Sequence, residues 1–217
     1  MHIQPLPSGA PNRPSLFPGI VHGDIKTDNV LVFEDEAGNL TAKVIDFGYS
    51  CFGTCPSSMV TVPRTKGWYA PEHEPGKLVE WADAQKMDLF SFGLVVCRLL
   101  LWEELTSAAT SKGLLLLPVG EGDNNSAANL DSMVDELKRT VQFLELTLQV
   151  LDTLSNVTGH EKKILRTVLS LTLDPNPSLR ATSFSEIISI MDNTPDRRPL
   201  SFQPVHIDKL CEEVVEV

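Results

Sequence analysis

The chain has 217 residues, of which 42% are hydrophobic and 22% are charged, a composition typical of a globular protein and not of a disordered one. With 18 Lys and Arg against 29 Asp and Glu its formal net charge is -11, which argues against nucleic acid as the main partner. It contains no apolar run of about 18 residues and no basic-then-apolar signal segment, so we expect no membrane span and a cytoplasmic or nuclear location. The oligomeric state stays open.

Composition divides the chain into three parts. Residues 1–19 contain five prolines, which remove backbone donors and prevent a continuous helix, so we expect a disordered leader. Residues 20–195 carry the patterns of a folded domain, and residues 196–217 form an acidic tail. Ordered structure is therefore expected to begin near Ile20.

The first regular element predicted after the leader is a β-hairpin. Two short β-prone segments, Val30 to Phe33 and Thr41 to Ile45, flank a polar turn over residues 34–39 that contains a glycine. A loop rich in Gly, Ser, Thr and Pro then extends from Asp46 to about Gly76, and the chain beyond it has helical patterning.

Four helices are predicted downstream. The segment from Lys86 to Trp102 is apolar nearly all round, as in a central buried helix. From Val134 to Leu151, hydrophobic residues recur at steps of three and four, which favours one amphipathic helix; a coiled-coil seam is the alternative, but it would need more heptads. A further helix is expected from His160 to Leu173. The last begins near Ser183, which with Glu186 makes a capping box.

Chemistry-bearing side chains flank the predicted hairpin in the sequence, before its first strand and after its second. Asp24 and Asn29 precede its first strand, and Asp46 follows its second, so the hairpin can bring all three to one end. Two carboxylates and an amide oxygen can hold Mg²⁺, a hard cation that prefers oxygen ligands and substrate phosphates. Lys26 adds a positive charge beside them, as phosphoryl transfer requires.

Taken in chain order, these residues resemble the carboxy-terminal lobe of a eukaryotic-type protein kinase. The family's catalytic-loop motif is met by His22, Asp24, Lys26 and Asn29. Its magnesium motif is met by Asp46, Phe47 and Gly48, and its Ala-Pro-Glu motif by Ala70, Pro71 and Glu72. Three further positions fit the family. Thr65 resembles the substrate-loop threonine of Ser/Thr-specific members, and Asp88 resembles the aspartate that anchors the catalytic loop. Arg180 resembles the arginine that pairs with the glutamate of Ala-Pro-Glu. One such motif is weak evidence, but six elements in the family's order, over about residues 20 to 192, are strong.

The resemblance implies a fold, a reaction and its cofactors. The fold is mainly α with a small β-hairpin, α+β overall, as in a kinase C-terminal lobe. The reaction is transfer of the ATP γ-phosphate to protein Ser or Thr, with ATP and Mg²⁺ as cofactors and a protein substrate or scaffold as partner.

The resemblance also assigns roles. Asp24 would orient the substrate hydroxyl or accept its proton, and Lys26 would neutralise charge on the transferring phosphoryl group. Asn29 and Asp46 would hold magnesium, and with Lys26 they would bind ATP. Thr65 would act beside Asp24 in the substrate loop. The remaining matched residues would be structural: His22, Phe47, Gly48, Glu72, Asp88 and Arg180.

Two departures from the family pattern leave alternatives open. Gly23 replaces the arginine that often precedes the aspartate of the catalytic loop, a feature shared with small-molecule phosphotransferases, which lack an Ala-Pro-Glu segment. Only 21 residues, rich in proline, precede His22. We therefore expect the amino-terminal lobe to be missing and this chain alone to be weakly active or inactive; a non-catalytic pseudokinase that binds a partner is the alternative.

Overall fold

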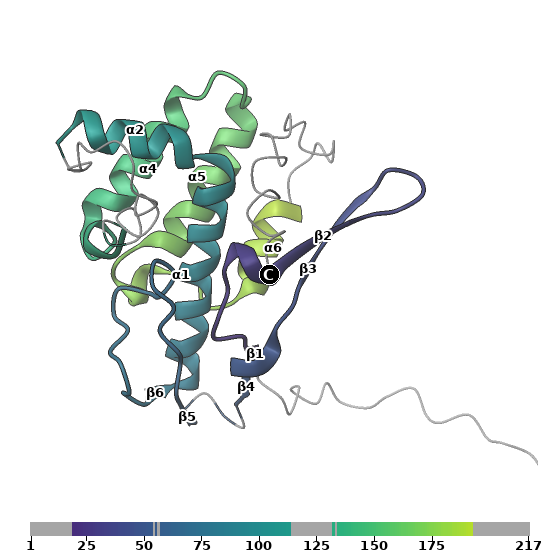
Figure 1. Cartoon of the computed structure of the whole chain (residues 1–217), viewed down its shortest axis with the longest axis vertical. Coiled ribbons are helices and arrows are strands. Elements are labelled where there is room, and N and C mark those ends of the chain that lie inside the picture. The colour runs from purple at the N-terminus through teal and green to yellow at the C-terminus, as the bar shows by residue number, and fades with distance from the viewer. Residues whose placement is uncertain (1–18, 54, 56, 114–131, 133, 193–217) are drawn as a thin grey trace, which may run out of the picture.

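A long helix, α1 (Trp81–Leu100), runs through the middle of the molecule, with other helices along it and a β-hairpin projecting from one side (Figure 1). The structure is a computed structural model that describes residues 19–53, 55, 57–113, 132 and 134–192. The predicted acidic tail and nearly all of the proline-rich leader lie outside these residues. The described part is mainly helical with few short strands, as the sequence predicts.

The projecting hairpin consists of β2 (Val30–Glu34) and β3 (Leu40–Val44), paired antiparallel so that Val30 faces Val44. Its turn is closed by Asp35, whose Oδ1 accepts hydrogen bonds from the backbone N–H groups of Ala37 at 2.9 Å and Asn39 at 2.8 Å. The predicted hairpin is confirmed, with strand ends shifted by one residue.

Two smaller pairings lie within the segments expected to be loop or helix. β1 (Ile20–Val21) pairs with β4 (Cys51–Phe52), and β5 (Met59–Val60) pairs with β6 (Val79–Glu80), both antiparallel. Strands of two residues are too short to show an alternating pattern, so the sequence did not predict them. Through these pairings, the loop after Asp46 is held against the first residues of α1.

The central helix differs from its predicted span at both ends. It begins at Trp81 instead of Lys86, because Trp81 and Ala84 are buried against Val21 of β1 and extend the apolar surface towards the amino end. It ends at Leu100 instead of Trp102, because Leu101 leaves helical geometry and starts a second helix, α2 (Trp102–Ser111).

The single helix predicted over Val134 to Leu151 is wrong. A short helical turn at residues 134–137 is followed by a break, and α4 (Val141–Thr153) begins after Thr140, whose φ of -118° and ψ of 154° are extended. The break shifts the phase of the buried face, so the buried residues of α4 are Phe143, Leu146, Thr147, Val150 and Leu151. The amphipathic core role is nevertheless correct, because this face lies in the main hydrophobic cluster.

The last two long helices lie near their predicted positions. α5 (Gly159–Leu173) is confirmed, and it starts with a complete capping box that was not predicted, in which Thr158 and Glu161 each accept the other's backbone N–H. α6 (Phe184–Asp192) is also confirmed, but the capping box predicted for Ser183 and Glu186 is wrong: the Glu186 side chain accepts from the backbone N–H of Thr182, and the N–H of Glu186 donates to the carbonyl of Ser183.

Helix α5 packs closely along α1 at a glycine. A side chain at Gly93 would place its first carbon only 2.5 Å from Oγ1 of Thr172 and 2.7 Å from Cδ2 of Leu173. The absence of a side chain therefore lets the two helices approach and fixes α1 in the core, which in turn positions Asp88 on α1 beneath the catalytic-loop motif.

Candidate active site

The carboxylate of Asp24 is the centre of the candidate site and is only 5% exposed. Three side chains donate to it: Lys26 Nζ to Oδ2 at 2.8 Å, Asn29 Nδ2 to Oδ2 at 3.1 Å, and Thr65 Oγ1 to Oδ1 at 2.6 Å. Lys26 and Asn29 come from the same short loop, whereas Thr65 is supplied by a distant segment. The fold therefore brings together residues that the sequence separates by 41 positions.

Hydrogen bonds keep Asp24 ionised. Burial acts to raise the pKa of Asp24, but the donors Lys26, Thr65 and Asn29 outweigh it and hold that pKa below its ordinary value. The hydrogen bond to Asp24 in turn raises the pKa of Lys26. A carboxylate and an ammonium group thus stay charged side by side at neutral pH.

Asp88 holds the loop from behind. Its Oδ2 accepts the backbone N–H of His22 at 2.6 Å, and its Oδ1 accepts that of Gly23 at 2.9 Å. Burial raises the pKa of Asp88 to about 6, while these two N–H groups oppose the rise. Asp88 therefore connects the central helix directly to the two residues before Asp24.

His22 links the loop to the hairpin. Its Nε2 donates to the carbonyl of Ile45 at 2.9 Å, and its Nδ1 accepts the N–H of Asp24 at 3.2 Å, so these partners place the ring proton on Nε2. The ring also packs against Phe47, with centroids 5.0 Å apart. His22 and Phe47 thus fix the distance between the loop and Asp46.

Backbone geometry explains the glycine before Asp24. Gly23 has φ of +80°, and a side chain there would meet the carbonyl oxygen of Tyr49 at 3.0 Å and Pro63 at 3.4 Å. An arginine, or any other L-residue, would be strained at this position.

Asn29 and Asp46 lie at neighbouring places where the hairpin joins the body, because the N–H of Ile45 donates to the carbonyl of Asn29 at 2.9 Å. Both amide hydrogens of Asn29 point to Asp24, one to its carbonyl at 2.8 Å and one to its side chain, which leaves Oδ1 without a donor among the described residues. Asp46 is exposed, and its Oδ1 accepts the N–H of Gly48 at 3.2 Å and no other donor from the part of the chain that the structure describes.

Asp46 also adopts a rare backbone conformation. Its φ of 59° is in the left-handed region, and among the described residues it is the one non-glycine there. Such strain is found at functional sites more often than elsewhere. The oxygen atoms of Asn29 and Asp46 fit a magnesium ion that keeps several waters and substrate phosphates as its other ligands. No larger His, Cys, Asp and Glu cluster suited to a metal occurs in the described part of the chain.

Glu72 and Arg180 form the connection between the Ala-Pro-Glu motif and the last helices. Arg180 donates through Nη1 to Oε1 of Glu72 at 2.6 Å and through Nη2 to Oε2 at 2.8 Å. Its side chain is fully buried, stacks on Phe90 at 4.7 Å and also donates to the carbonyl of Asp174. The segment carrying Thr65 is thereby anchored at its downstream end.

One charged cluster near Thr65 was not predicted from the sequence. Lys138 is completely buried, pairs with Asp135 at 2.6 Å and lies 3.4 Å from the ring centroid of Tyr69, while Asp135 also accepts the N–H of Gly67 at 3.2 Å. Burial lowers the pKa of Lys138 to about 8, although Asp135 opposes this. No local pattern could have indicated a lysine buried by a segment so distant in sequence.

The family model described as protein kinase domain matches residues 18–191. Cysteine-rich receptor-like protein kinase 42 of Arabidopsis thaliana is 32% identical over 191 residues, which is 86% of this chain and 25% of that protein. Wall-associated receptor kinase 3 of the same plant is 41% identical over 83 residues, 37% of this chain and 10% of that protein. A leucine-rich repeat receptor-like serine/threonine-protein kinase of Arabidopsis thaliana is 27% identical over 176 residues, 77% of this chain and 15% of that protein.

The helical fold and the matched motifs are those of the protein kinase class. The chain belongs to the protein kinase family. It spans a quarter or less of the length of the relatives named above. None of the helices in the described ranges combines the length and apolarity needed to cross a bilayer.

Proposed function

We propose that this chain is the carboxy-terminal catalytic lobe of a protein kinase that transfers the ATP γ-phosphate to Ser or Thr of a protein. The observation that carries the proposal is the convergence of Lys26, Asn29 and Thr65 on the buried carboxylate of Asp24. Relatives that cover most of the chain are named receptor-like kinases, one of them a serine/threonine kinase, which supports the choice of acceptor.

In the proposed mechanism, Asp24 positions the acceptor hydroxyl and takes its proton as the phosphoryl group transfers. Ionised Asp24 has an Oδ2 held by Lys26 and an Oδ1 held by Thr65, so its orientation is fixed before substrate binds. The Lys26 ammonium lies beside the same carboxylate and would offset negative charge on the phosphoryl group.

Asn29 and Asp46 would hold magnesium through oxygen atoms that the described residues leave available. When bound, the ion would neutralise charge on the substrate phosphates. The residues' part is orientation: Asn29 is fixed through Asp24, and Asp46 is fixed through its bond to Gly48.

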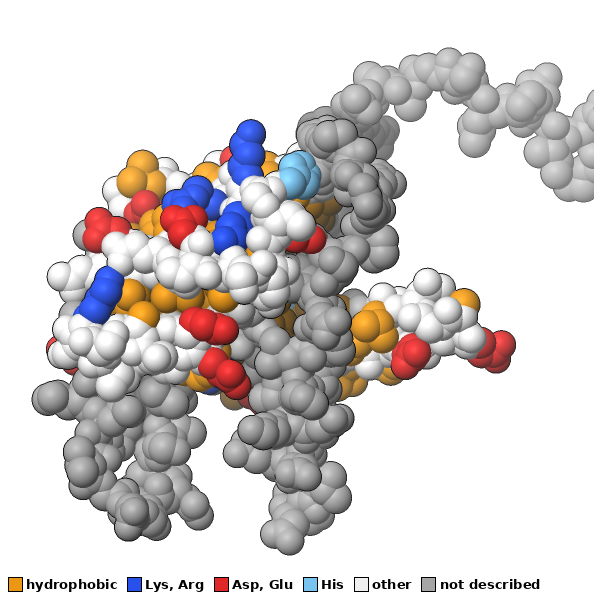
Figure 2. Space-filling model, turned by 90° about the horizontal axis from the view of Figure 1, so that it is seen from above, with side chains coloured by type: hydrophobic (Ala, Val, Ile, Leu, Met, Phe, Trp, Pro, Cys, Tyr) orange, Lys and Arg blue, Asp and Glu red, His pale blue; other side chains and the backbone are white. Residues whose placement is uncertain are grey.

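We further propose that the described residues form one wall of the nucleotide cleft and that a second lobe completes it. The exposed hydrophobic side chains of the hairpin, which protrudes to the right in Figure 2, support this: Leu31, Val32, Phe33, Leu40 and Val44. Because positioning supplies most of the rate in phosphoryl transfer, we expect the chain on its own to turn over weakly or not at all.

The test is phosphotransfer from γ-labelled ATP with Mg²⁺ to a degenerate peptide library containing Ser or Thr, using this chain and the longest protein that contains it. Asp24→Asn should abolish transfer, and the exposed neighbour Asp28→Asn is the matched control that should retain it. Absence of transfer by both proteins would overturn the proposal. Phosphorylation of amino sugars or choline in place of peptides would favour the small-molecule phosphotransferase.

A second candidate is a non-catalytic module that binds a protein partner. The exposed hydrophobic hairpin is the observation in its favour, since large apolar patches mark interaction sites. Partner binding that survives Asp24→Ala with Asp46→Ala, in a protein that shows no phosphotransfer, would support it. Turnover that is lost in this double variant would count against it.

A further inference from the structure

Positive charge gathers around Tyr69, in a place that phosphoryl transfer does not use. The guanidinium of Arg64 stacks 4.1 Å from the ring centroid of Tyr69 and donates to its hydroxyl at 2.5 Å. The Nζ of Lys138 lies 3.4 Å from the same centroid. Arg139, exposed to solvent, is the next residue after Lys138.

These charges are only partly neutralised. Asp135 pairs with Lys138 at 2.6 Å, and Glu136 is an exposed acid on the same turn. Neither Arg64 nor Arg139 forms a salt bridge with any residue that the structure describes, although both are exposed. Since no carboxylate among the described residues pairs with either arginine, Arg64 and Arg139 offer a place for an anion from outside, in a chain whose net charge is -11.

This basic cluster is connected rigidly to the candidate active site. The backbone N–H groups of Trp68 and Tyr69 both donate to the carbonyl of Thr65, at 3.0 and 3.2 Å. Thr65 in turn donates to Asp24 at 2.6 Å. A group bound at Tyr69 would thus be held at a fixed position relative to the carboxylate of Asp24.

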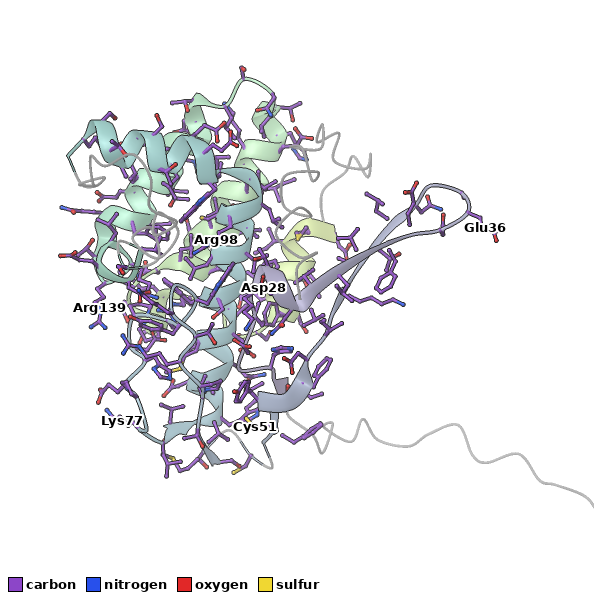
Figure 3. All side chains as sticks on the ribbon, in the orientation of Figure 1. Asp28, Glu36, Cys51, Lys77, Arg98 and Arg139 are labelled. Carbon is purple, nitrogen blue, oxygen red and sulfur yellow. The ribbon has the colours of Figure 1, made fainter. Side chains whose placement is uncertain are left out.

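The exposed arginine of the cluster, Arg139, lies away from the loop that carries Asn29. In Figure 3 Arg139 lies on the side of α1 opposite the hairpin, whereas Asp28 lies on the hairpin side, next to the catalytic loop. An anion at the cluster would therefore belong to the acceptor substrate and not to the nucleotide that meets Asn29 and Asp46.

We propose that Arg64 and Arg139 recognise an anionic side chain, a carboxylate or a phosphate, that flanks the acceptor hydroxyl in the substrate protein. The proposal rests on the proposed kinase function and names its substrate class. Arginine suits this role because its planar guanidinium presents paired donors to carboxylate and phosphate oxygens. Arg64 donates one hydrogen bond to the Tyr69 hydroxyl, and its remaining N–H groups can donate to a ligand.

The first experiment measures binding, so that it does not depend on turnover. Fluorescent peptides with one Ser acceptor carry Ala, Glu, phosphoserine or Lys at the flanking positions, and their affinity for this chain is measured by anisotropy at low and moderate salt. We expect the Glu or phosphoserine peptide to bind about threefold to tenfold more tightly than the Ala peptide, the range of one or two exposed charge contacts. The stronger of the two identifies the anion. Equal affinities for all four peptides would overturn the proposal.

Variants assign the preference to the two arginines. Arg64→Gln with Arg139→Gln should remove it, while the control Lys77→Gln with Arg166→Gln, which removes the same charge from residues paired with Glu74 and Asp152, should keep it. Equal loss of the anion preference in both double variants would show a general charge effect and contradict the proposal. If loss of Arg64 disturbs Tyr69, the single variant Arg139→Glu tests the proposal in its place, because Arg139 is exposed. This variant should shift the binding preference towards the Lys peptide.

Turnover separates this proposal from the kinase function. Phosphotransfer that shows no preference among the four peptides would overturn the anion site and leave the kinase function standing. An anion preference in binding, without phosphotransfer by this chain or a longer protein, would support the site and count against the kinase function.

Discussion

Arg180 and Glu72 face each other as a two-pronged ion pair although 108 positions separate them in the sequence. Glu72 lies just beyond the segment that carries Thr65, and Arg180 lies between helices α5 and α6. The pair therefore closes the carboxy-terminal part of the fold onto the segment that supplies Thr65.

Arg180→Met should destabilise the protein strongly, because it leaves Glu72 without its cation and three carbonyl oxygens without their donor: those of Asp174, Lys86 and Pro175. Removing one partner of a buried pair costs about 3–5 kcal/mol. Urea unfolding measures this, with Lys77→Met as the control, since Lys77 forms an exposed pair worth about 0–1 kcal/mol. Similar midpoints for both variants would contradict the prediction.

Thr65→Val should raise the pKa of Asp24, because it removes a hydroxyl that donates to Oδ1 at 2.6 Å without changing the side-chain shape. A hydrogen bond to a charged group is worth about 1.5–3 kcal/mol, so the rise should be large enough to measure. Carbon-13 NMR of the Asp24 carboxyl measures it directly. Thr65→Ser keeps the hydroxyl and should leave the pKa in place, so an equal shift in both variants would argue for a different cause.

Asp46→Asn should weaken divalent cation binding, because the proposed ligand loses its charge while the turn to Gly48 is kept. Manganese in the presence of ADP is the probe, followed by water proton relaxation, and a loss of about tenfold or more is expected. Asp28→Asn is the matched control, an exposed acid in the loop that carries Asn29 and one to which no role is assigned. Removal of the metal with a chelator should reduce nucleotide binding in the wild type and have little further effect on Asp46→Asn.

Asp88 should make stability depend on pH between about 4 and 6. Its pKa is about 6 in the folded protein against an ordinary 3.8, so the folded state binds the proton more readily. The resulting stabilisation is complete below pH 3.8 and is lost as the pH rises through 6, an effect of about 3 kcal/mol.

Comparison with Asp88→Asn isolates this effect from other carboxylates. The difference in unfolding free energy, wild type minus variant, should fall as the pH rises from 4 to 7, measured by urea titration at each pH. A difference that stays constant over this interval would show that Asp88 titrates normally in the folded state.

Much of the fold follows from local patterns in the sequence. The β2–β3 hairpin and helix α5 were predicted closely because their signals lie within the segments themselves: two β-prone stretches around a glycine-containing turn, and helical patterning over a continuous stretch. Ends and breaks were harder. Nothing local shows that Trp81 will be covered by Val21, or that the chain will leave helical geometry at Thr140.

The candidate site divides in the same way. Asp24, Lys26 and Asn29 lie so close in sequence that their convergence could be expected, and the motif order suggested the partners Thr65 and Arg180. The buried pair of Lys138 and Asp135 could not be anticipated, because it depends on a tertiary contact with Tyr69 that no spacing encodes. The glycine before Asp24 appeared to be a loss of an arginine, and its φ of +80° gives the reason.

The two proposed metal ligands are carried by the base of a hairpin whose strands pair only with each other among the described residues. A lone two-stranded ribbon is of marginal stability in water. If Asn29 and Asp46 hold a cation as proposed, its apparent affinity is the intrinsic affinity multiplied by the fraction of molecules whose hairpin is paired. Gly38, in the turn with φ of +82°, is thereby coupled to a cation it never touches. On the proposed role of Asn29 and Asp46, the hairpin turn would set, at a distance, the fraction of the protein that is competent to bind metal.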